Sequence, residues 1–277
     1  MRKVLFLGQN WFGEAAWERL RRFENDSMKV VAVCSNSSSQ TTWWQSSQVF
    51  ESAGDIPFIE NAYRNDHILL DAIKKYDVNT ILCVQHPWVL SVDVLIAVKY
   101  NALNFHNAKL PKYRGYNAVN HAILNKDEKF TCTAHWMVDK VDQGDIAYEA
   151  TFTISKDETA ISLYAKCYHA GLRLFEKVVY DLAKLHSVPH RPIVGQGRFY
   201  SRHSIDTLRE IKELYELDVK SRAFYLPPFE PAFISLNDRR VYVLPQTLNN
   251  LGFKVGSLDI LKEAIQAMEG LFQCDVY

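Results

Sequence analysis

Short apolar runs alternate with helical patterns through the first half of this chain. The strand-like runs are Val4–Leu7, Val30–Cys34, Ile56–Ile59, Thr80–Val84 and Ala102–His106. The helical patterns between them are Gly13–Phe23, His67–Tyr76 and Val92–Val98. A helix between consecutive strands allows those strands to lie parallel, with helices on both faces of the sheet. The sequence therefore predicts an α/β fold with a doubly wound, mostly parallel sheet.

The pattern continues to about residue 187 and then changes. Thr131–Met137 and Ile146–Ile154 are typical of later strands, and Ile161–Leu185 of a long helix. Beyond them, two apolar runs at 233–236 and 240–244 flank a short polar turn, which is typical of a β-hairpin. Ser257 is a candidate cap for a final helix. We expect a main domain over residues 1–187 and a small C-terminal α+β appendage, with the hairpin, over 188–277.

Charge and hydropathy exclude several classes of protein. The 32 basic and 32 acidic residues leave a formal net charge of zero, which argues against a nucleic-acid partner. No apolar run approaches the ~20 residues that span a bilayer, and the apolar run near the N-terminus is too short for a signal peptide. Five cysteines without C-x-x-C spacing favour a reducing cytoplasm, and no cluster shows metal-ligand spacing.

Three polar side chains suggest a catalytic site. Asn104 and His106 lie two residues apart on one expected strand and so share a face. Asp142 follows on a later loop, where Gly144 permits a tight turn close to a ligand. An amide that stabilises an oxyanion, a histidine that moves protons and an orienting carboxylate suit acyl transfer to an amine. The alternative is a strand end whose polar side chains only bond the backbone.

The combined motif Asn104-x-His106, Leu110-Pro111-x-x-x-Gly115 and Asp142-x-Gly144 resembles that of the folate-dependent formyltransferases. The resemblance extends from Met1 to about Leu185. It implies a Rossmann-like formyltransferase domain and N10-formyltetrahydrofolate as the formyl donor. It also implies that Asn104, His106 and Asp142 are the catalytic residues. This chain has Ala108 and Lys109 where many members have serine and a second leucine.

The resemblance also implies a folate-binding loop shortly before the motif. In relatives this loop grips the pterin ring through its backbone. The folate-binding residues expected here are Gln85, His86, Pro87, Trp88, Val89, Leu90, Asp139 and Asp142. The alternative for Trp88 and Leu90 is ordinary packing. His135 is either beside the active site, as in related enzymes, or a histidine of the core.

Residues that would bind the formyl acceptor are harder to identify. Gly8 and Gly13 do not complete a dinucleotide-binding motif, so the residues between them are candidates for contacting the acceptor. Basic residues near the motif could bind a phosphate or a sugar group. An arginine after residue 220, flanked by aromatic residues and prolines, could bind a diphosphate and a base. The candidates are Gln9, Asn10, Lys112, Arg114, Arg222, Tyr225 and Phe229. Trp43 and Trp44 could stack on a sugar, with packing as the alternative.

Within the family, the sugar-nucleotide N-formyltransferases fit best. The neutral tail is short for a tRNA-binding domain, and Pro227-Pro228-Phe229 resembles a segment of the sugar enzymes. We therefore expect a dTDP- or UDP-linked 3-amino or 4-amino-deoxysugar as acceptor, in O-antigen or related glycan synthesis. A homodimer through the hairpin is expected, with no nucleic-acid or membrane partner. The alternatives are a methionyl-tRNA formyltransferase, a formyltetrahydrofolate hydrolase, and a non-catalytic folate or nucleotide-sugar binding protein.

Overall fold

The structure is a computed structural model that describes residues 1–37, 48–60, 66–237, 239–245, 260–270 and 272–277. Trp43, Trp44 and the expected helix cap Ser257 lie outside these ranges. The main-sheet strands are β1 (Arg2–Gly8), β2 (Met28–Ser35), β3 (Phe58–Glu60), β4 (Thr80–Val84), β5 (Ala102–His106), β7 (Lys129–Trp136), β8 (Ile146–Thr153) and β12 (Asp275–Val276). The α-helices are α1 (Asn10–Arg22), α2 (Gln48–Glu51), α3 (Asp66–Tyr76), α4 (Val92–Ala97), α5 (Ala118–Leu124), α6 (Ala160–Ala183), α7 (Leu217–Ala223) and α8 (Ile260–Met268).

In the described part of the chain, eight strands form one sheet in the order β12-β8-β7-β5-β4-β1-β2-β3. The pairs from β3 through β5 are parallel, as the alternation of strands and helices predicts. From β5 to β12 the pairs are antiparallel. Strands β7 and β8 follow one another without a helix between them, which suits an antiparallel pair. The expected doubly wound, mostly parallel α/β fold is thus confirmed, with an antiparallel extension on one side.

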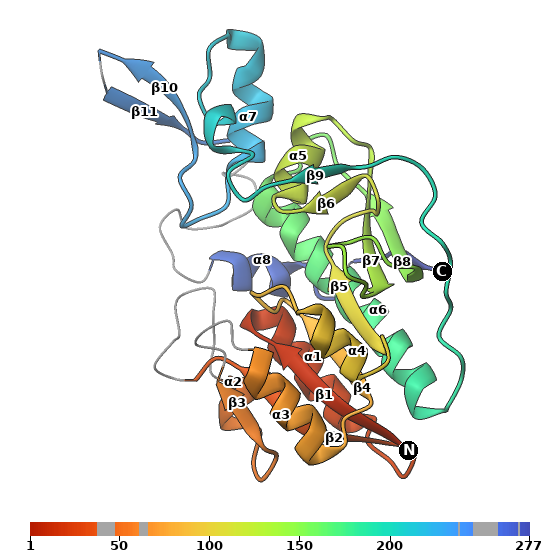
Figure 1. Cartoon of the computed structure of the whole chain (residues 1–277). Helices are drawn as coiled ribbons and strands as arrows, with labels where there is room; N and C mark the ends of the chain where they lie inside the picture. Colours follow the sequence, from red (N-terminus) through yellow and green to blue (C-terminus); the bar gives the residue numbers. More distant parts are fainter. Residues whose placement is uncertain (38–47, 61–65, 238, 246–259, 271) are drawn as a thin grey trace.

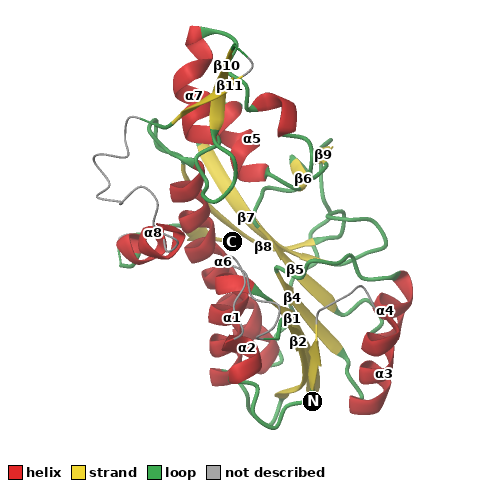
Figure 2. Cartoon of the chain, turned by 90° about the vertical axis from the view of Figure 1, so that its left-hand side faces the viewer, coloured by secondary structure: helices red, strands yellow, loops and turns green. Residues whose placement is uncertain are grey.

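Helices cover both faces of this sheet, as Figure 2 shows. The side chains of β1 alternate between two buried clusters, as the two-residue period of a strand requires. Val4 and Phe6 belong to the core under α1 and α6, whereas Leu5 and Leu7 belong to the core under α3 and α4. Because both faces of β1 are buried, this strand is apolar without interruption over Val4–Leu7.

Residues beyond 187 form the expected hairpin and also return to the main domain. The hairpin pairs β10 (Ala232–Leu236) with β11 (Arg239–Val243) and projects away from the main sheet (Figure 1). Strand β9 (Arg198–Tyr200) pairs with β6 (Tyr113–Gly115), α8 packs on α6, and β12 joins β8 at the sheet edge. The domain division at residue 187 stays a prediction, but this C-terminal segment contributes to the main fold.

Helix α6 is 24 residues long and packs along the sheet. Its Phe175 is fully buried, with its ring centroid 5.0 Å from that of Phe105 and 6.2 Å from that of Phe6. Within the described ranges, none of the helices combines the length and apolar character that a membrane span requires.

Replacing Phe175 by Ala should destabilise the fold by about 3–5 kcal/mol, because it removes a buried ring and leaves a cavity between two strands and a helix. Urea unfolding would measure the loss. Tyr180→Ala is the matched control, since Tyr180 lies on the same helix with 44% of its surface exposed. Its expected cost is within about 0.5 kcal/mol. Equal losses in the two variants would contradict the assigned core.

Candidate active site

Two cavities of different character meet at His106. The first, about 220 Å³, is lined largely by apolar side chains, and we call it the apolar cavity. The second, about 470 Å³, is lined by several amide side chains, and we call it the amide-lined cavity. His106, Gly115 and Tyr116 line both. A group in one cavity can therefore react with a group in the other beside the His106 ring.

Strand β5 positions the first two catalytic candidates. Leu103 and Phe105 point into the core, whereas Asn104 and His106 alternate with them and are half-buried. Both polar side chains line the apolar cavity. The two-residue period thus places the amide and the imidazole on one face, as the sequence predicts.

Strand β7 places a second histidine directly opposite Asn104. In the antiparallel register Asn104 pairs with His135. The His135 Nδ1–H donates to the carbonyl oxygen of Trp136 at 3.0 Å, so the lone pair of the neutral ring lies on Nε2. That Nε2 accepts a hydrogen bond from Asn104 Nδ2 at 3.1 Å. His135 therefore orients the Asn104 amide and leaves its second N–H available to an oxyanion.

The His106 ring is held by the chain that follows it. Its Nε2–H donates to the carbonyl oxygen of Tyr113 at 2.8 Å, so Nδ1 carries the lone pair of the neutral ring. Asp142 lies beside both histidines, with Oδ2 3.8 Å from His106 Nε2 and Oδ1 3.5 Å from His135 Nε2. The three predicted catalytic residues thus come together, with His135 as a fourth member.

The Asp142 carboxylate is buried but ionised. Burial alone would raise its pKa, but the nearby His106 ring, the contact with His135 and a hydrogen bond from the Gly115 backbone N–H at 2.8 Å together outweigh it. The net effect holds the pKa of Asp142 well below its usual range. A permanent negative charge therefore lies between two imidazoles and stabilises either ring when it is protonated.

Gly144 allows close packing against the protein itself rather than against a ligand. A Cβ at this position would lie 1.8 Å from the carbonyl oxygen of Trp136. The same loop is closed by the backbone N–H of Trp136, which donates to the carbonyl oxygen of Asp145 at 2.8 Å. Glycine is therefore required to bring the Asp142 loop back onto the end of β7.

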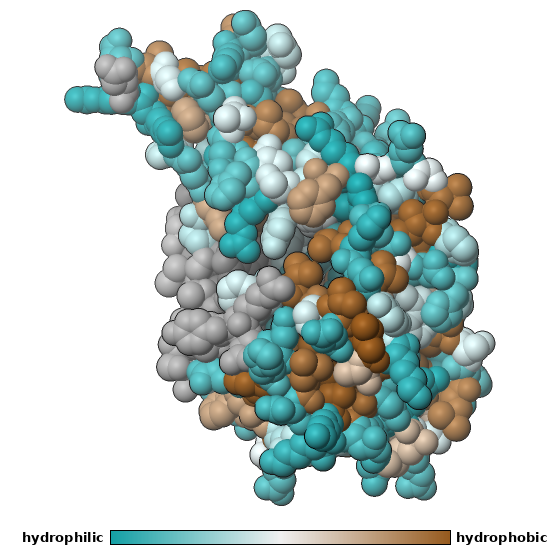
Figure 3. Space-filling model, in the orientation of Figure 1, coloured by the Kyte–Doolittle hydropathy of each residue, from teal (hydrophilic) through white to brown (hydrophobic). Residues whose placement is uncertain are grey.

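The segment expected to bind folate divides between the two cavities. His86, Pro87, Trp88, Val89 and Leu90 line the apolar cavity. Figure 3 shows hydrophobic side chains gathered over the region of α4 and β5, and Trp88 and Val89 are 41% and 52% exposed. Burial lowers the pKa of His86 to about 4, so this ring is neutral at neutral pH.

The two remaining folate candidates lie at the edges of this arrangement. Gln85 lines the amide-lined cavity, where its Oε1 accepts a weak hydrogen bond from Asn10 Nδ2 at 3.5 Å. Asp139 accepts a hydrogen bond from Tyr100 at 2.8 Å, between Val138 and Lys140 of the apolar cavity lining.

Three of the residues expected to bind the acceptor lie together in the amide-lined cavity. Gln9 and Asn10 enter it from the start of α1, where Gln9 is the N-cap residue and Asn10 the first residue, and Phe229 enters from the C-terminal segment. Arg202 also lines this cavity, and the sequence analysis missed it. Its guanidinium lies over the Tyr116 ring, 5.2 Å from the centroid. No motif marks Arg202, because it reaches the cavity only through the pairing of β9 with β6.

The other acceptor candidates lie elsewhere among the described residues. Lys112 forms an ion pair with Asp127 at 2.7 Å, and Arg114 lines a separate cavity. Tyr225 is 3% exposed and packs in a cluster with Ile161. These three side chains are absent from the lining of both central cavities.

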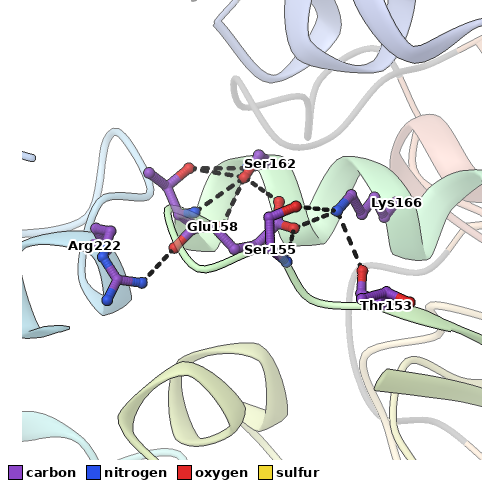
Figure 4. Close-up of polar contacts among 7 residues, drawn as sticks. Thr153, Ser155, Glu158, Ser162, Lys166 and Arg222 are labelled. Atoms are coloured by element: carbon purple, nitrogen blue, oxygen red, sulfur yellow. Dashed lines mark hydrogen bonds and ion pairs between the residues drawn. The ribbon is translucent and has the colours of Figure 1, made fainter. Parts of the chain in front are cut away.

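Arg222 joins the C-terminal segment to the start of α6. Its Nη2 donates to Asp218 at 2.7 Å and its Nη1 to the carbonyl oxygen of Glu158 at 3.0 Å. Figure 4 shows this contact beside the network in which Glu158 is paired with Lys166 and bonded to Ser162. Arg222 thus anchors the segment that carries Phe229, rather than entering the amide-lined cavity.

No group of three or more His, Cys, Asp or Glu side chains among the described residues could hold a metal ion. A larger cavity, about 670 Å³, lies between α1, α6 and α8. It shares no lining residue with the two central cavities, so the chemistry of Asn104, His106 and Asp142 belongs to the smaller ones.

Replacing Asp142 by Asn should destabilise the fold in a pH-dependent way. A carboxyl whose pKa is lowered by folding stabilises the protein above its ordinary value of 3.8, and that stabilisation is lost as pH falls through the folded value. The difference in unfolding free energy from the wild type should therefore be full above about pH 5 and shrink below about pH 4. Urea unfolding across this range measures it.

The matched control is Asp145→Asn, three residues away with a side chain that is 42% exposed. We expect this variant to keep the wild-type stability within about 0.5 kcal/mol at neutral pH, because its side chain is partly exposed. A gap for Asp142→Asn that keeps its full size at about pH 3 would contradict the ionised carboxylate.

Curated proteins and solved structures similar to this chain are formyltransferases of several kinds. A methionyl-tRNA formyltransferase of Fusobacterium nucleatum is 24% identical over 179 residues, which are 64% of this chain and 57% of that protein. This chain therefore matches less than two thirds of that relative's length.

Two solved structures share the fold. A 4-N formyltransferase from Francisella tularensis has a TM-score of 0.72 at 20% identity, with 88% of this chain and 96% of that one covered. An N-formyltransferase from Helicobacter canadensis, in complex with folinic acid and dTDP-3-aminofucose, has a TM-score of 0.66 at 19% identity, with 87% and 86% covered.

Residues 2–179 match the profile of the family described as formyl transferase. The match covers more than half of the chain and includes Asn104, His106 and Asp142. This chain belongs to the formyl transferase family.

Proposed function

We propose that this protein transfers a formyl group from N10-formyltetrahydrofolate to the amine of a nucleotide-linked amino-deoxysugar. The observation that carries the proposal is that two cavities of different character share His106, beside Asn104 and Asp142. Such an arrangement suits a donor and an acceptor that meet at one reacting carbon. The Helicobacter canadensis structure, which contains both folinic acid and dTDP-3-aminofucose, supports the same pairing of ligands.

The apolar cavity suits the folate donor. A pterin is flat, with hydrogen-bonding groups at its edge, and irregular backbone between apolar walls can bind both features. The segment from His86 to Leu90 offers such a backbone, and Met137 and Val141 line the same cavity. Its single lining lysine among the described residues is Lys140.

The amide-lined cavity suits a nucleotide sugar. The side-chain oxygens of Asn117 and Asn120 can accept hydrogen bonds from sugar hydroxyls, while their Nδ2 groups donate to the carbonyl oxygens of Arg202 and Ala223 and so hold the two amides in place. Arg202 offers a cation for a diphosphate, and the exposed rings of Tyr116 and Phe229 offer stacking surfaces for a base. This set of groups matches the three chemical parts of a nucleotide-linked sugar.

The residues around His106 can support each step of the transfer. The acceptor nitrogen forms a bond to the formyl carbon, and the bond from that carbon to N10 of the folate breaks. Asn104 donates its second N–H to the oxyanion that forms on the formyl oxygen. His106 Nδ1 takes the proton that the amine loses, and Asp142 stabilises the imidazolium until a proton reaches N10.

Methionyl-tRNA formyl transfer is the second candidate, because the Fusobacterium nucleatum relative carries that name. Backbone recognition of a nucleic acid needs several clustered cations. This chain is neutral overall, and Arg202 is the one arginine or lysine in the described lining of the amide-lined cavity. These features favour the sugar acceptor over tRNA. Hydrolysis of the folate, with water as acceptor, is a further outcome of the test.

We also propose a setting for the reaction. Five free cysteines suit a reducing cytoplasm, where nucleotide sugars for glycans such as O-antigen are modified. The projecting hairpin exposes Leu236, Val241 and Tyr242, and a second copy that covers these side chains would form a homodimer.

A direct assay tests the proposed function. The protein is mixed with N10-formyltetrahydrofolate and with dTDP- or UDP-linked 3-amino and 4-amino sugars, and mass spectrometry follows the gain of one formyl group. We expect a formylated sugar nucleotide. Formylation of methionyl-tRNA alone would refute the sugar acceptor, and folate consumption without an acceptor would indicate a hydrolase.

Asn104→Ala should lower kcat in the same assay by about 10²–10³, because it removes one oxyanion donor.

Arg202→Ala should raise KM for the nucleotide sugar about tenfold or more, since it removes a charge-assisted contact to the diphosphate. The KM for the folate should stay unchanged. Arg198→Ala is the matched control, because Arg198 lies on the preceding strand over Tyr200 and outside the described cavity linings. An unchanged KM for the sugar in Arg202→Ala would refute this assignment.

A further inference from the structure

Arg202 lies on a turn that follows strand β9. The strand ends at Tyr200, and the next four residues form the turn. The backbone N–H of Ser204 donates across it to the carbonyl oxygen of Ser201 at 3.1 Å. We call residues 201–204 the arginine turn. Because Arg202 lies in neither a strand nor a helix, the direction of its side chain depends on what holds this turn.

The start of α5 contacts the arginine turn at two points. Asn117, the N-cap residue of α5, and His121 lie four residues apart, which brings both to one side of the helix. Asn117 Nδ2 donates to the carbonyl oxygen of Arg202 at 2.9 Å. His121 Nε2 and Ser204 Oγ are joined by a hydrogen bond of 2.9 Å. The arginine turn is therefore attached to α5 at Arg202 itself and two residues later.

His121 also joins this turn to the strand before it. Its ring lies against that of Tyr200, with the centroids 3.9 Å apart and the planes at 36°. The side chain is buried and is absent from the lining of both central cavities. Burial and the nearby Arg198 lower the pKa of His121 to about 4, so the ring is neutral at neutral pH. His121 therefore acts on a ligand through the residues that it holds, rather than through contact or charge.

Arg202 is the residue whose direction this arrangement fixes. Its side chain lines the amide-lined cavity, with the guanidinium 5.2 Å from the centroid of the Tyr116 ring. A long side chain loses conformational freedom when it binds a phosphate, and the loss is smaller when the backbone already directs it at the ligand. Holding the arginine turn thus strengthens a contact to phosphate without adding a group to that contact.

We propose that His121 is a positioning residue for the formyl acceptor, because it holds the arginine turn in the place from which Arg202 reaches the diphosphate. The inference rests on the proposed function, in which Arg202 binds the diphosphate of a nucleotide sugar. Loss of the bond between His121 and Ser204 should weaken binding of the acceptor. It should leave the steps at His106 unchanged, since that ring is held by β5 and the segment that follows it.

Calorimetric titration with dTDP and UDP tests the inference without requiring turnover. His121→Phe keeps a ring beside Tyr200 but cannot bond Ser204, and Ser204→Ala removes the same bond from the other side. We expect each variant to bind the nucleotide that the wild type prefers about three- to tenfold more weakly. His121→Gln should recover most of the affinity, because its amide can bond Ser204. The matched control is His203→Ala, which removes a side chain that is 82% exposed from the same turn and should keep the wild-type affinity.

A double-mutant cycle separates positioning from a general loss of structure. If His121 acts through Arg202, His121→Phe should have no further effect in an Arg202→Ala background. In steady-state kinetics, His121→Phe should raise KM for the nucleotide sugar by a similar factor and leave kcat and the KM for the folate unchanged. Urea unfolding shows whether each single variant folds, and Ser204→Ala carries the same test if His121→Phe does not fold.

Several results would overturn the inference. These are wild-type affinity in both His121→Phe and Ser204→Ala, an equal loss in His203→Ala, and a loss in His121→Phe that persists in full without Arg202. If neither nucleotide binds the wild type, the inference and the proposed acceptor fail together. If Arg202→Ala alone weakens nucleotide binding, the inference fails and the acceptor site stands. The expected pattern of nucleotide affinities without formyl transfer to any sugar would refute the proposed reaction alone.

Discussion

The antiparallel pairing of β5 with β7 is the contact on which the whole site depends. It sets Asn104 opposite His135 and so fixes the direction of the Asn104 side-chain amide. It also ends β7 at Trp136, whose carbonyl oxygen accepts from His135 and packs against Gly144. Because the backbone N–H of Trp136 closes the same loop at Asp145, Asp142 is held at a fixed distance from both histidines.

This arrangement places the negative charge of Asp142 between the imidazole rings of His106 and His135. An isolated buried carboxylate would be costly and would tend to take up a proton. Here the Gly115 N–H and the two imidazoles stabilise the charged form of Asp142. The same charge is then available to stabilise an imidazolium during a reaction. The contacts that keep the buried carboxylate ionised are therefore the same ones that place it beside both imidazoles.

The C-terminal segment is part of the site as well as part of the fold. Strand β9 brings Phe199 to the apolar cavity and Arg202 to the amide-lined cavity. Leu226 and Phe229 form another wall of the amide-lined cavity, and the Arg222 contact with Glu158 holds their segment against α6. The part of the chain that lies beyond the family match thus lines both central cavities.

Sequence alone predicted the parallel part of the sheet, its helical layers and the polar residues that meet beside β5. Short apolar runs separated by helical patterns are typical of a sheet buried on both faces, and Asn104-x-His106 needs only the two-residue period of a strand to place both side chains on one face. The motif with Asp142 was sufficient to identify the family. These features are local, or they repeat along the chain, so they can be recognised from the sequence alone.

The tertiary structure decided which charged side chains face which cavity. Four cations that look alike in the sequence have different surroundings in the structure. Lys112 is paired with Asp127, and Arg114 lines a separate cavity. Arg202 lines the amide-lined cavity, and Arg222 anchors α7. The contacts of these side chains depend on segments far away in the chain, such as β9 beside β6. No sequence pattern predicts where a long cationic side chain lies, because its environment depends on the segment that packs against it.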